Sequence, residues 1–439
     1  MKRHSKLFAL ALAVAMTGGT ETTFAATEIQ WWHAFTGRLG ELLAVQVDTF
    51  NKSQSDYQVV PVYKGNYTET LNAGVAAFRA NQQPHILQVY EVGTATMMAA
   101  EGAVKPVYEV MAEAGEPFDA NAYLKPVTGY YTTADGKMLS LPYNSSTPVL
   151  YYNRDAFKAA GLDPANPPKT WDELDGALKA LKASGSACPF TTAWQSWIQL
   201  ENLGAWHNVP FATKDNGFGG LDTELVFNGP LQVKHIDQLG QWAKEGLFVY
   251  AGRRNEAGGR FRSGECAIFT ESSAGYAGIK DEAQFDFGVS SLPYWAGTPG
   301  TPQNTIIGGA SLWVMEGHEA EEYKGVAKFL AFLSSPEIQA QWHQDSGYLP
   351  ITPAAYELTK SQGFYDKNPG TDVGIKQMLG KEPTGNSAGV RLGNFDQIRG
   401  IIDEELEAVW SGDKVAQAAL DSAVERGNQL LRRFERANQ

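Results

Sequence analysis

Short apolar segments alternate with amphipathic helical segments along this chain, and the alternation begins again near Leu150. Residues 28–35, 57–62 and 85–90 have the apolar character of buried strands, and apolar side chains recur at helical spacing between them. Alternating strands and helices predict crossover units built around mainly parallel sheets. We therefore expect an α/β fold.

The second run of alternation predicts a second lobe. Strands are expected at residues 266–270, 285–290 and 312–315, and helices at 194–206, 231–245, 319–333 and 415–434. Thr170 and Glu173 have the spacing of a capping box, which marks the start of another helix. Because a single hydrophobic core stops growing at roughly 250–300 residues, a chain of 439 residues favours two α/β lobes joined by several crossings.

The first 25 residues have the pattern of a secretory signal peptide. Lys2, Arg3 and Lys6 precede an uninterrupted apolar run at residues 7–16, and the segment ends in small residues. The run is shorter than the roughly 20 apolar residues that span a bilayer. We expect cleavage after Ala25, which releases a soluble protein into the periplasm.

Charge and cysteine content restrict the function further. The formal net charge is −13, and loss of the signal segment, which has three basic residues and one acidic residue, takes it to −15. This acidity argues against nucleic acid and anionic membranes as partners. Cys188 and Cys266 are the only cysteines. Outside the cytoplasm they can form a disulfide or remain two buried thiols, and the sequence leaves both possibilities open.

Two motifs typical of enzymes are absent from this sequence. The chain has no Walker A loop and no H-E-x-x-H. Its histidines stand singly rather than at the spacing of metal ligands. We therefore predict no catalytic residue, no metal and no cofactor.

Polar residues gather instead where the predicted strands end. The segments are 63–67, 90–93, 144–147, 271–273, 307–310 and 347–348. Ligand sites of open α/β sheets form at the carboxyl ends of strands, and hydroxyl and glycine N–H groups are suitable donors to a phosphate. Trp194 and Trp197 are three residues apart on a predicted helix, where they would share one face as a core stripe or as a stacking wall for a ligand.

The same segments resemble the family of periplasmic glycerol-3-phosphate-binding proteins of ABC importers, within family 1 of the extracellular solute-binding proteins. The matching stretches are YKGNY at 63–67, LQVYEVGTATMMA at 87–99, NSSTPVLYYN at 144–153, IIGGASLWVM at 306–315, GYLPIT at 347–352 and AVERGNQLLRRFE at 423–435. The resemblance covers essentially all of the mature chain. It implies the maltose-binding-protein-like, type II periplasmic-binding-protein fold, whose two α/β lobes close on the ligand about a hinge. On this basis residues 26–140 and 308–352 are predicted to form one lobe, and residues 141–307 and 353–439 the other.

The resemblance implies nine ligand-binding residues: Tyr67, Glu91, Ser146, Trp194, Trp197, Ser272, Gly309, Tyr348 and Arg399. Glu91 would accept hydrogen bonds from glycerol hydroxyls, and Arg399 would hold the phosphate through its planar guanidinium. The hydroxyl groups at positions 146, 272 and 348 and the N–H of Gly309 would donate to phosphate oxygens. On this interpretation, replacing Arg399 by alanine abolishes binding and leaves folding intact.

The function implied is that of a solute-binding component of an ABC importer. It would capture sn-glycerol 3-phosphate, and also glycerophosphodiesters such as glycerophosphocholine. It would work as a monomer and deliver its ligand to permease subunits in the inner membrane, which are driven by a cytoplasmic ATPase. An oligosaccharide or polyol ligand is the alternative, because clefts rich in tryptophan also bind sugars. A secreted phosphodiesterase is the enzyme alternative, but it needs a nucleophile with its base, or metals.

Overall fold

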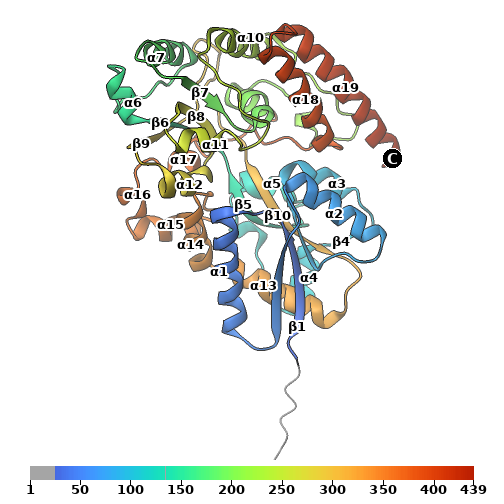
Figure 1. Ribbon diagram of the computed structural model, residues 1–439. Coiled ribbons are helices and arrows are strands. Elements are labelled where there is room, and N and C mark those ends of the chain that lie inside the picture. The colour runs from blue at the N-terminus through green and yellow to red at the C-terminus, as the bar shows by residue number, and fades with distance from the viewer. Residues whose placement is uncertain (1–24, 134) are drawn as a thin grey trace, which may run out of the picture.

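Two α/β lobes, each built on its own sheet, form the protein (Figure 1). The computed structural model describes residues 25–133 and 135–439, so the predicted signal peptide lies, apart from Ala25, outside the described residues. The first sheet has the strand order β2-β1-β3-β10-β4, with β5 also paired to β10, and the second has the order β7-β8-β6-β9. The predicted two-lobed α/β architecture is confirmed.

The first lobe takes most of its elements from the first third of the chain. Its strands are β1 (Thr27–His33), β2 (Tyr57–Tyr63), β3 (Ile86–Tyr90), β4 (Val104–Lys105), β5 (Leu141–Ser146) and β10 (Gly308–Met315), and its helices are α1 (Gly37–Ser53), α2 (Tyr67–Arg79), α3 (Thr94–Met98), α4 (Val107–Ala114), α5 (Lys125–Tyr131), α13 (Ala320–Leu333) and α14 (Pro336–Ser346). The chain therefore leaves this lobe after β5 and returns to it at β10.

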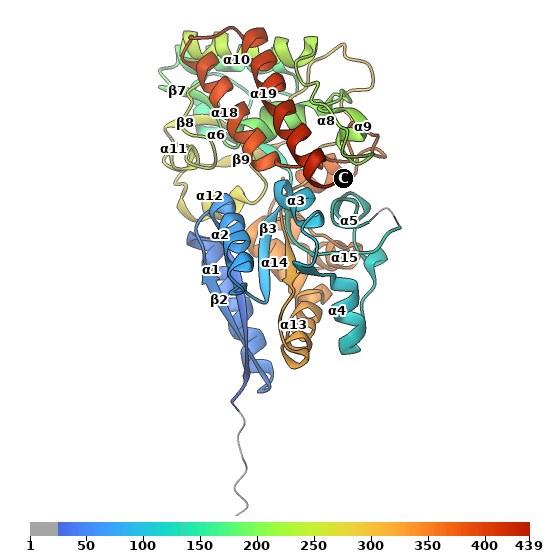
Figure 2. The same ribbon diagram turned by 90° about the vertical axis from the view of Figure 1, so that its right-hand side faces the viewer.

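The second lobe is formed by the middle of the chain and its last two helices. Its strands are β6 (Pro148–Asn153), β7 (Cys188–Thr192), β8 (Cys266–Ser272) and β9 (Phe287–Ser290), and its helices are α6 (Arg154–Ala159), α7 (Trp171–Ala183), α8 (Leu203–Trp206), α9 (Thr213–Asn216), α10 (Pro230–Glu245), α11 (Gly258–Arg262), α12 (Gly275–Glu282), α18 (Phe395–Trp410) and α19 (Ala416–Ala437). Three short helices, α15 (Pro353–Ser361), α16 (Phe364–Lys367) and α17 (Val373–Met378), lie in the return segment between α14 and α18. Figure 2 shows α18 and α19 above α2 and α3 of the first lobe.

Strand pairing is mixed rather than mainly parallel. β1 runs parallel to β2 and β3, and β7 runs parallel to β8. β10 is antiparallel to β3, β4 and β5, and β6 is antiparallel to β8 and β9. The expectation of mainly parallel sheets fails at β10 and β6 because each is the first strand after a crossing and enters its sheet from the opposite direction.

The crossing between the lobes falls at Thr147, between β5 and β6. This is a few residues beyond the boundary predicted at residue 140, because residues 141–146 pair with β10 of the first sheet. The Thr147 hydroxyl donates to Thr305 Oγ1 at 2.7 Å or to the Ile306 carbonyl at 3.0 Å, so two crossing segments are tied side by side. The remaining lobe boundaries stay a prediction.

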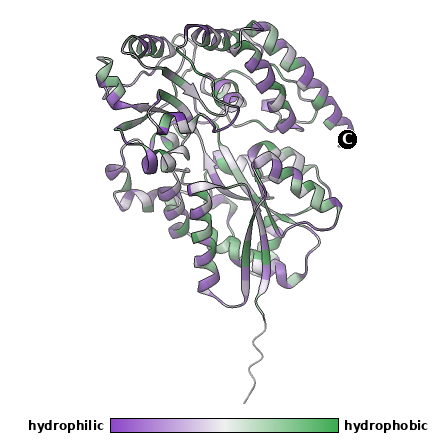
Figure 3. Ribbon diagram, viewed as in Figure 1, coloured by the Kyte–Doolittle hydropathy of each residue, from purple (hydrophilic) through white to green (hydrophobic). Residues whose placement is uncertain are grey.

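Local sequence signals account for where several helices begin and end. Thr170 and Glu173 form the predicted capping box of α7. A second capping box, Asn66 with Glu69, starts α2 and thereby fixes the backbone beside Tyr67. Figure 3 shows hydrophobic and hydrophilic residues alternating along the peripheral helices, which is the pattern of helices that bury one face. No helix in the described part of the chain combines the length and apolar character needed to cross a membrane.

Cys188 and Cys266 form a disulfide between the neighbouring strands β7 and β8. The two residues are direct partners in the parallel register, and both are buried. The structure thus decides between the two possibilities that the sequence left open.

Candidate functional site

A pocket of about 380 Å³ lies between the two lobes. All nine ligand-binding residues predicted from the sequence line it. The first lobe contributes Tyr67, Glu91, Ser146, Gly309 and Tyr348, and the second contributes Trp194, Trp197, Ser272 and Arg399. The structure therefore brings the predicted residues together, whereas their individual roles in binding stay a prediction.

Ser146 and Gly309 lie on paired strands rather than in the loops expected for them. Ser146 ends β5 opposite Gly308, and Gly309 lies near the start of β10. Gly309 has φ +97°, and a Cβ added there would lie 1.8 Å from the Asn144 carbonyl oxygen. Only glycine fits this close approach of the two strands that line the pocket at Ser146 and Gly309.

We predict that Gly309→Ala weakens ligand binding and lowers the free energy of unfolding by about 1–3 kcal/mol, because the new methyl group displaces β5 and forces a strained backbone angle. Urea unfolding and titration calorimetry measure the two effects. The control is Gly129→Ala, since a Cβ there meets nothing within 4 Å and the position is helical. Equal stability of the two variants would contradict the account.

A chain of amide side chains orients the phenol of Tyr67. The Ala34 N–H donates to Gln88 Oε1 at 2.8 Å, Gln88 Nε2 donates to Asn144 Oδ1 at 2.9 Å, and Asn144 Nδ2 donates to the Tyr67 hydroxyl at 3.0 Å. The Tyr67 ring also stacks on Tyr90 with a centroid distance of 5.2 Å. Burial raises the pKa of Tyr67 to about 12, so its hydroxyl stays a neutral donor that points into the pocket wall.

The two tryptophans reach the pocket in different ways. Trp194 lies before the helix and has φ +44°, an unusual angle for a bulky residue, so the prediction that both tryptophans share one helix face is wrong. Trp197 begins a π-helical segment, Trp197–Asn202. Its buried indole N–H donates to the Ile307 carbonyl at 3.4 Å, and its ring lies against Gly308, where an added Cβ would come within 2.5 Å.

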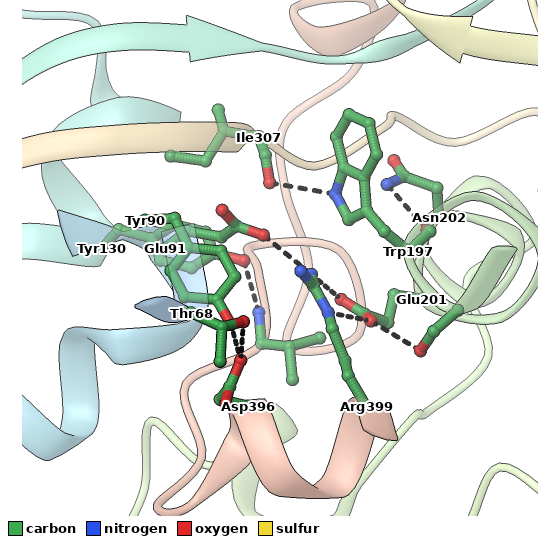
Figure 4. Close-up of polar contacts among 12 residues, drawn as sticks. Thr68, Tyr90, Glu91, Tyr130, Trp197, Glu201, Asn202, Ile307, Asp396 and Arg399 are labelled. Carbon is green, nitrogen blue, oxygen red and sulfur yellow. Dashed lines mark hydrogen bonds and ion pairs between the residues drawn. The ribbon is translucent and has the colours of Figure 1, made fainter. Parts of the chain in front are cut away.

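Arg399 is held by two buried carboxylates (Figure 4). Its Nε and Nη2 donate to the two oxygens of Glu201 at 2.8 and 2.7 Å, and Nη2 also donates to Glu91 Oε1 at 2.7 Å. Nη1 makes no hydrogen bond to any described residue, and Arg399 lines the pocket. The guanidinium is therefore fixed on one side and free to bind an anion on the other.

The charges of this cluster favour a proton on Glu91. One guanidinium and two carboxylates sum to one negative charge in a buried setting. Burial raises the pKa of Glu91, and the Glu201 carboxylate raises it further, while Arg399 lowers it. Uptake of a proton by Glu91 would remove the excess negative charge that opposes a phosphate.

Two residues of the site were not identified from the sequence: Glu201, which holds Arg399, and Arg254, which lines the pocket. Glu201 is the single charged residue within the otherwise uncharged segment 197–206, and an isolated charge in such a segment is a usable signal of a buried ion pair. Arg254 lines the pocket, and its guanidinium lies 5.8 Å from the centroid of the Trp194 ring. Its neighbour Arg253 pairs with Glu407, so the dipeptide looks like ordinary surface charge.

The lobes touch each other beside the pocket. Asp396, at the start of α18, accepts hydrogen bonds from Thr68 at 2.8 Å and from Tyr90 of the first lobe. Arg254 Nη2 donates to Thr68 Oγ1 at 2.6 Å. Together with the pair Glu91 and Arg399, these contacts join the lobes across the cleft, as Figure 4 shows for Thr68, Tyr90 and Asp396.

One group among the described residues has the composition of a metal site: His85, His318 and Glu322. The two imidazole rings stack with centroids 3.9 Å apart and planes 23° apart, so one ion cannot lie in both ring planes. The Gln30 N–H donates to His85 Nδ1 at 3.0 Å, which leaves the ring proton on Nε2. The geometry of this group is that of an imidazole pair beside a carboxylate rather than that of a metal centre.

Donors from two α/β lobes that converge on one pocket, with direct contacts between the lobes beside it, define a two-lobed solute-binding protein. The chain belongs to the bacterial extracellular solute-binding protein family, whose model matches residues 46–371. This assignment places it among binding proteins rather than enzymes.

Curated relatives are similar over nearly the full length. The chain is 55% identical over 437 residues to the sn-glycerol-3-phosphate-binding periplasmic protein UgpB of Yersinia pseudotuberculosis, with 99% of each chain covered. It is 56% identical, over the same shares, to UgpB of Salmonella typhimurium. These relatives confirm the family resemblance seen in the sequence.

Solved structures confirm the fold. UgpB from Mycobacterium tuberculosis in complex with glycerophosphocholine matches with a TM-score of 0.77 at 22% identity, covering 93% of this chain and 99% of that one. The cyclic alpha-maltosyl-1,6-maltose binding protein from Arthrobacter globiformis matches with a TM-score of 0.73 at 24% identity, covering 92% and 99%. At these identities the likeness extends to the fold, and the predicted maltose-binding-protein-like architecture is confirmed.

Proposed function

We propose that this protein captures sn-glycerol 3-phosphate in the pocket between its lobes and delivers it to an ABC importer. The observation that carries the proposal is that all nine predicted ligand-binding residues line one pocket. The names of relatives that are 55–56% identical over 99% of the chain support it. The protein would act in the periplasm as a monomer, with permease subunits and their ATPase as partners and no role for nucleic acid.

The phosphate would bind to the free side of Arg399 and to neutral donors. Arg399 Nη1 offers a charged donor, while Glu201 keeps the guanidinium plane fixed. Ser272 Oγ accepts from the Ala274 N–H at 3.1 Å, so its own proton remains to donate. Burial raises the pKa of Tyr348 well above its usual value, which keeps that hydroxyl protonated. The N–H of Gly309 and the hydroxyl of Ser146 would complete the set.

The glycerol group would lie between Glu91 and the tryptophans. Glu91 would exchange part of its contact with Arg399 for hydrogen bonds from glycerol hydroxyls, since its Oε1 makes the ion pair. Trp197 is fixed against β10 and offers an apolar surface to the carbon chain. A dehydrated pocket strengthens each of these polar contacts. Glycerophosphodiesters such as glycerophosphocholine would use the same phosphate donors, with their second alcohol in the remaining part of the pocket.

Titration calorimetry on the mature protein, freed of bound ligand by unfolding and refolding, tests the proposal. We expect one-to-one binding of sn-glycerol 3-phosphate, with glycerol, inorganic phosphate and maltose much weaker. Binding of maltose or another polyol without binding of the phosphate ester would favour the oligosaccharide or polyol alternative. Circular dichroism of the refolded sample guards against a loss of fold.

A further inference from the structure

The pocket extends past the nine predicted residues toward a second carboxyl group, that of Glu271. Glu271 precedes Ser272 at the end of β8 and lines the same pocket. The additional lining comes from the start of α1, from α11 and from α12, including Arg262 and Glu282. The pocket thus has an acidic group one residue away from a proposed phosphate donor, where consecutive Cα atoms are about 3.8 Å apart.

The Glu271 side chain is buried without a cationic partner. Its exposed fraction is 5%, and Oε1 accepts the Ser272 N–H at 2.6 Å. Its methylene groups pack over Gly275, where an added Cβ would come within 2.8 Å of Glu271 Cγ. The Trp194 indole is a second hydrogen-bonding neighbour of this carboxyl, and no salt bridge among the described residues includes Glu271. A buried carboxyl at a pocket wall with no paired cation is a group that can bind a cationic part of a ligand.

The nearest guanidinium groups are engaged elsewhere. Arg262 Nε pairs with Glu282 Oε2 at 2.8 Å, and Arg254 lies over the Trp194 ring and donates to Thr68. Arg254 therefore occupies the position over Trp194 that a quaternary ammonium would take by cation–π contact. Beside these engaged arginines, the Glu271 carboxyl is an acceptor open to a ligand cation.

We propose that Glu271 is a specificity-determining residue that binds the protonated primary amine of a glycerophosphodiester whose second alcohol is an amino alcohol. The inference rests on the proposed function, because the phosphodiester must occupy the phosphate donors first. Two carbons separate the phosphate ester oxygen from the amine in an ethanolamine ester, so one ligand would contact both Ser272 and Glu271, which line the same pocket. A primary ammonium has three N–H donors and needs acceptors, whereas a trimethylammonium group has none to give.

The protonation of Glu271 gives the ligands opposite pH dependences. Burial raises the pKa of Glu271 to about 8, while the Ser272 N–H and Arg262 lower it. The titratable or charged groups that face it are Arg262, Glu256, Arg254, Tyr151, Tyr276 and Glu282. Below this pKa the neutral carboxyl tolerates a phosphate dianion. Above it the carboxylate attracts an ammonium and repels a dianion, so affinity for the amine ester rises with pH while affinity for glycerol 3-phosphate falls.

Titration calorimetry with sn-glycerol 3-phosphate, glycerophosphoethanolamine and glycerophosphocholine tests the inference. At about pH 8.5, above the pKa of Glu271, we expect the wild-type protein to prefer the ethanolamine ester over the choline ester by about tenfold, the effect of one charge-assisted hydrogen bond. Glu271→Gln should abolish this preference and keep affinity for glycerol 3-phosphate near pH 7. The matched control is Glu282→Gln, a lining carboxyl already paired with Arg262, and it should keep the preference.

Two further outcomes separate the possible failures. Equal affinity of the wild-type protein for the two diesters, or a preference that survives Glu271→Gln, overturns the role of Glu271 while leaving the proposed function intact. Failure of all three ligands to bind overturns the proposed function itself. If Glu271→Gln does not fold, the wild-type preference for the ethanolamine ester over the choline ester, measured from about pH 6.5 to about pH 8.5, decides: it should grow as the pH rises, and a constant preference overturns the role of Glu271.

Discussion

Arg399→Ala is expected to lose ligand binding and also to lower the free energy of unfolding by about 3–5 kcal/mol, the usual result of removing one partner of a buried ion pair. The arginine is bound to both oxygens of Glu201 and to Glu91; both acidic side chains are buried, and the arginine side chain is 12% exposed. Without it, two buried acidic groups remain in a low-dielectric setting with no cation. Chemical unfolding measured by circular dichroism gives the stability, and calorimetry gives the binding.

A second substitution distinguishes a structural from a purely ligand-binding role. Arg399→Ala combined with Glu201→Gln removes one of the stranded charges, so part of the lost stability should return while binding stays absent. The interpretation from sequence alone, in which Arg399 touches only the phosphate, expects full stability in the single variant. Finding that stability would exclude the ion cluster as a determinant of folding.

Removing the disulfide is expected to cost about 4 kcal/mol of stability. The bond closes a long loop, with a sequence separation of 78 residues, and the entropy of that loop in the unfolded chain sets the magnitude. Cys188→Ala with Cys266→Ala should therefore unfold at much lower denaturant concentration than the wild type under oxidising conditions. Reducing agent should bring the wild-type protein close to the variant.

Ligand binding should survive removal of the disulfide once the protein is folded. β8 runs from Cys266 to Ser272, so the disulfide and the pocket lie at opposite ends of that strand. A variant that is folded at low temperature but no longer binds would show that the disulfide shapes the pocket directly.

Much of the fold follows from local sequence signals. The buried strand at 86–90 and the capping box at Thr170 are set by apolar runs and by residue types with a specific backbone preference. The direction of the strands could not be predicted from such local signals, because β10 and β6 enter their sheets after crossings that no local pattern encodes. The disulfide was undecided for the same reason, since it depends on β7 and β8 becoming neighbours.

The sequence predicted which residues line the site, but not the hydrogen bonds and ion pairs that connect them to the rest of the protein. Family motifs gave nine lining residues, yet Glu201 was missed because its partner, Arg399, lies far away in sequence. The left-handed backbone of Trp194 and the π-helical segment after it are tertiary effects that helical periodicity does not reveal. Arg254 was missed because nothing in the sequence distinguishes it from Arg253, which pairs at the surface.

A crystal structure of the mature protein with bound sn-glycerol 3-phosphate is the most direct test of the central claim. The account predicts the phosphate between Arg399 Nη1 and the hydroxyl groups of Ser146, Ser272 and Tyr348, with the glycerol carbons against Trp197 and a hydroxyl group donating to Glu91. A ligand seated elsewhere, or a phosphate that makes no contact with Arg399 while Glu91 and Glu201 keep it enclosed, would contradict the account.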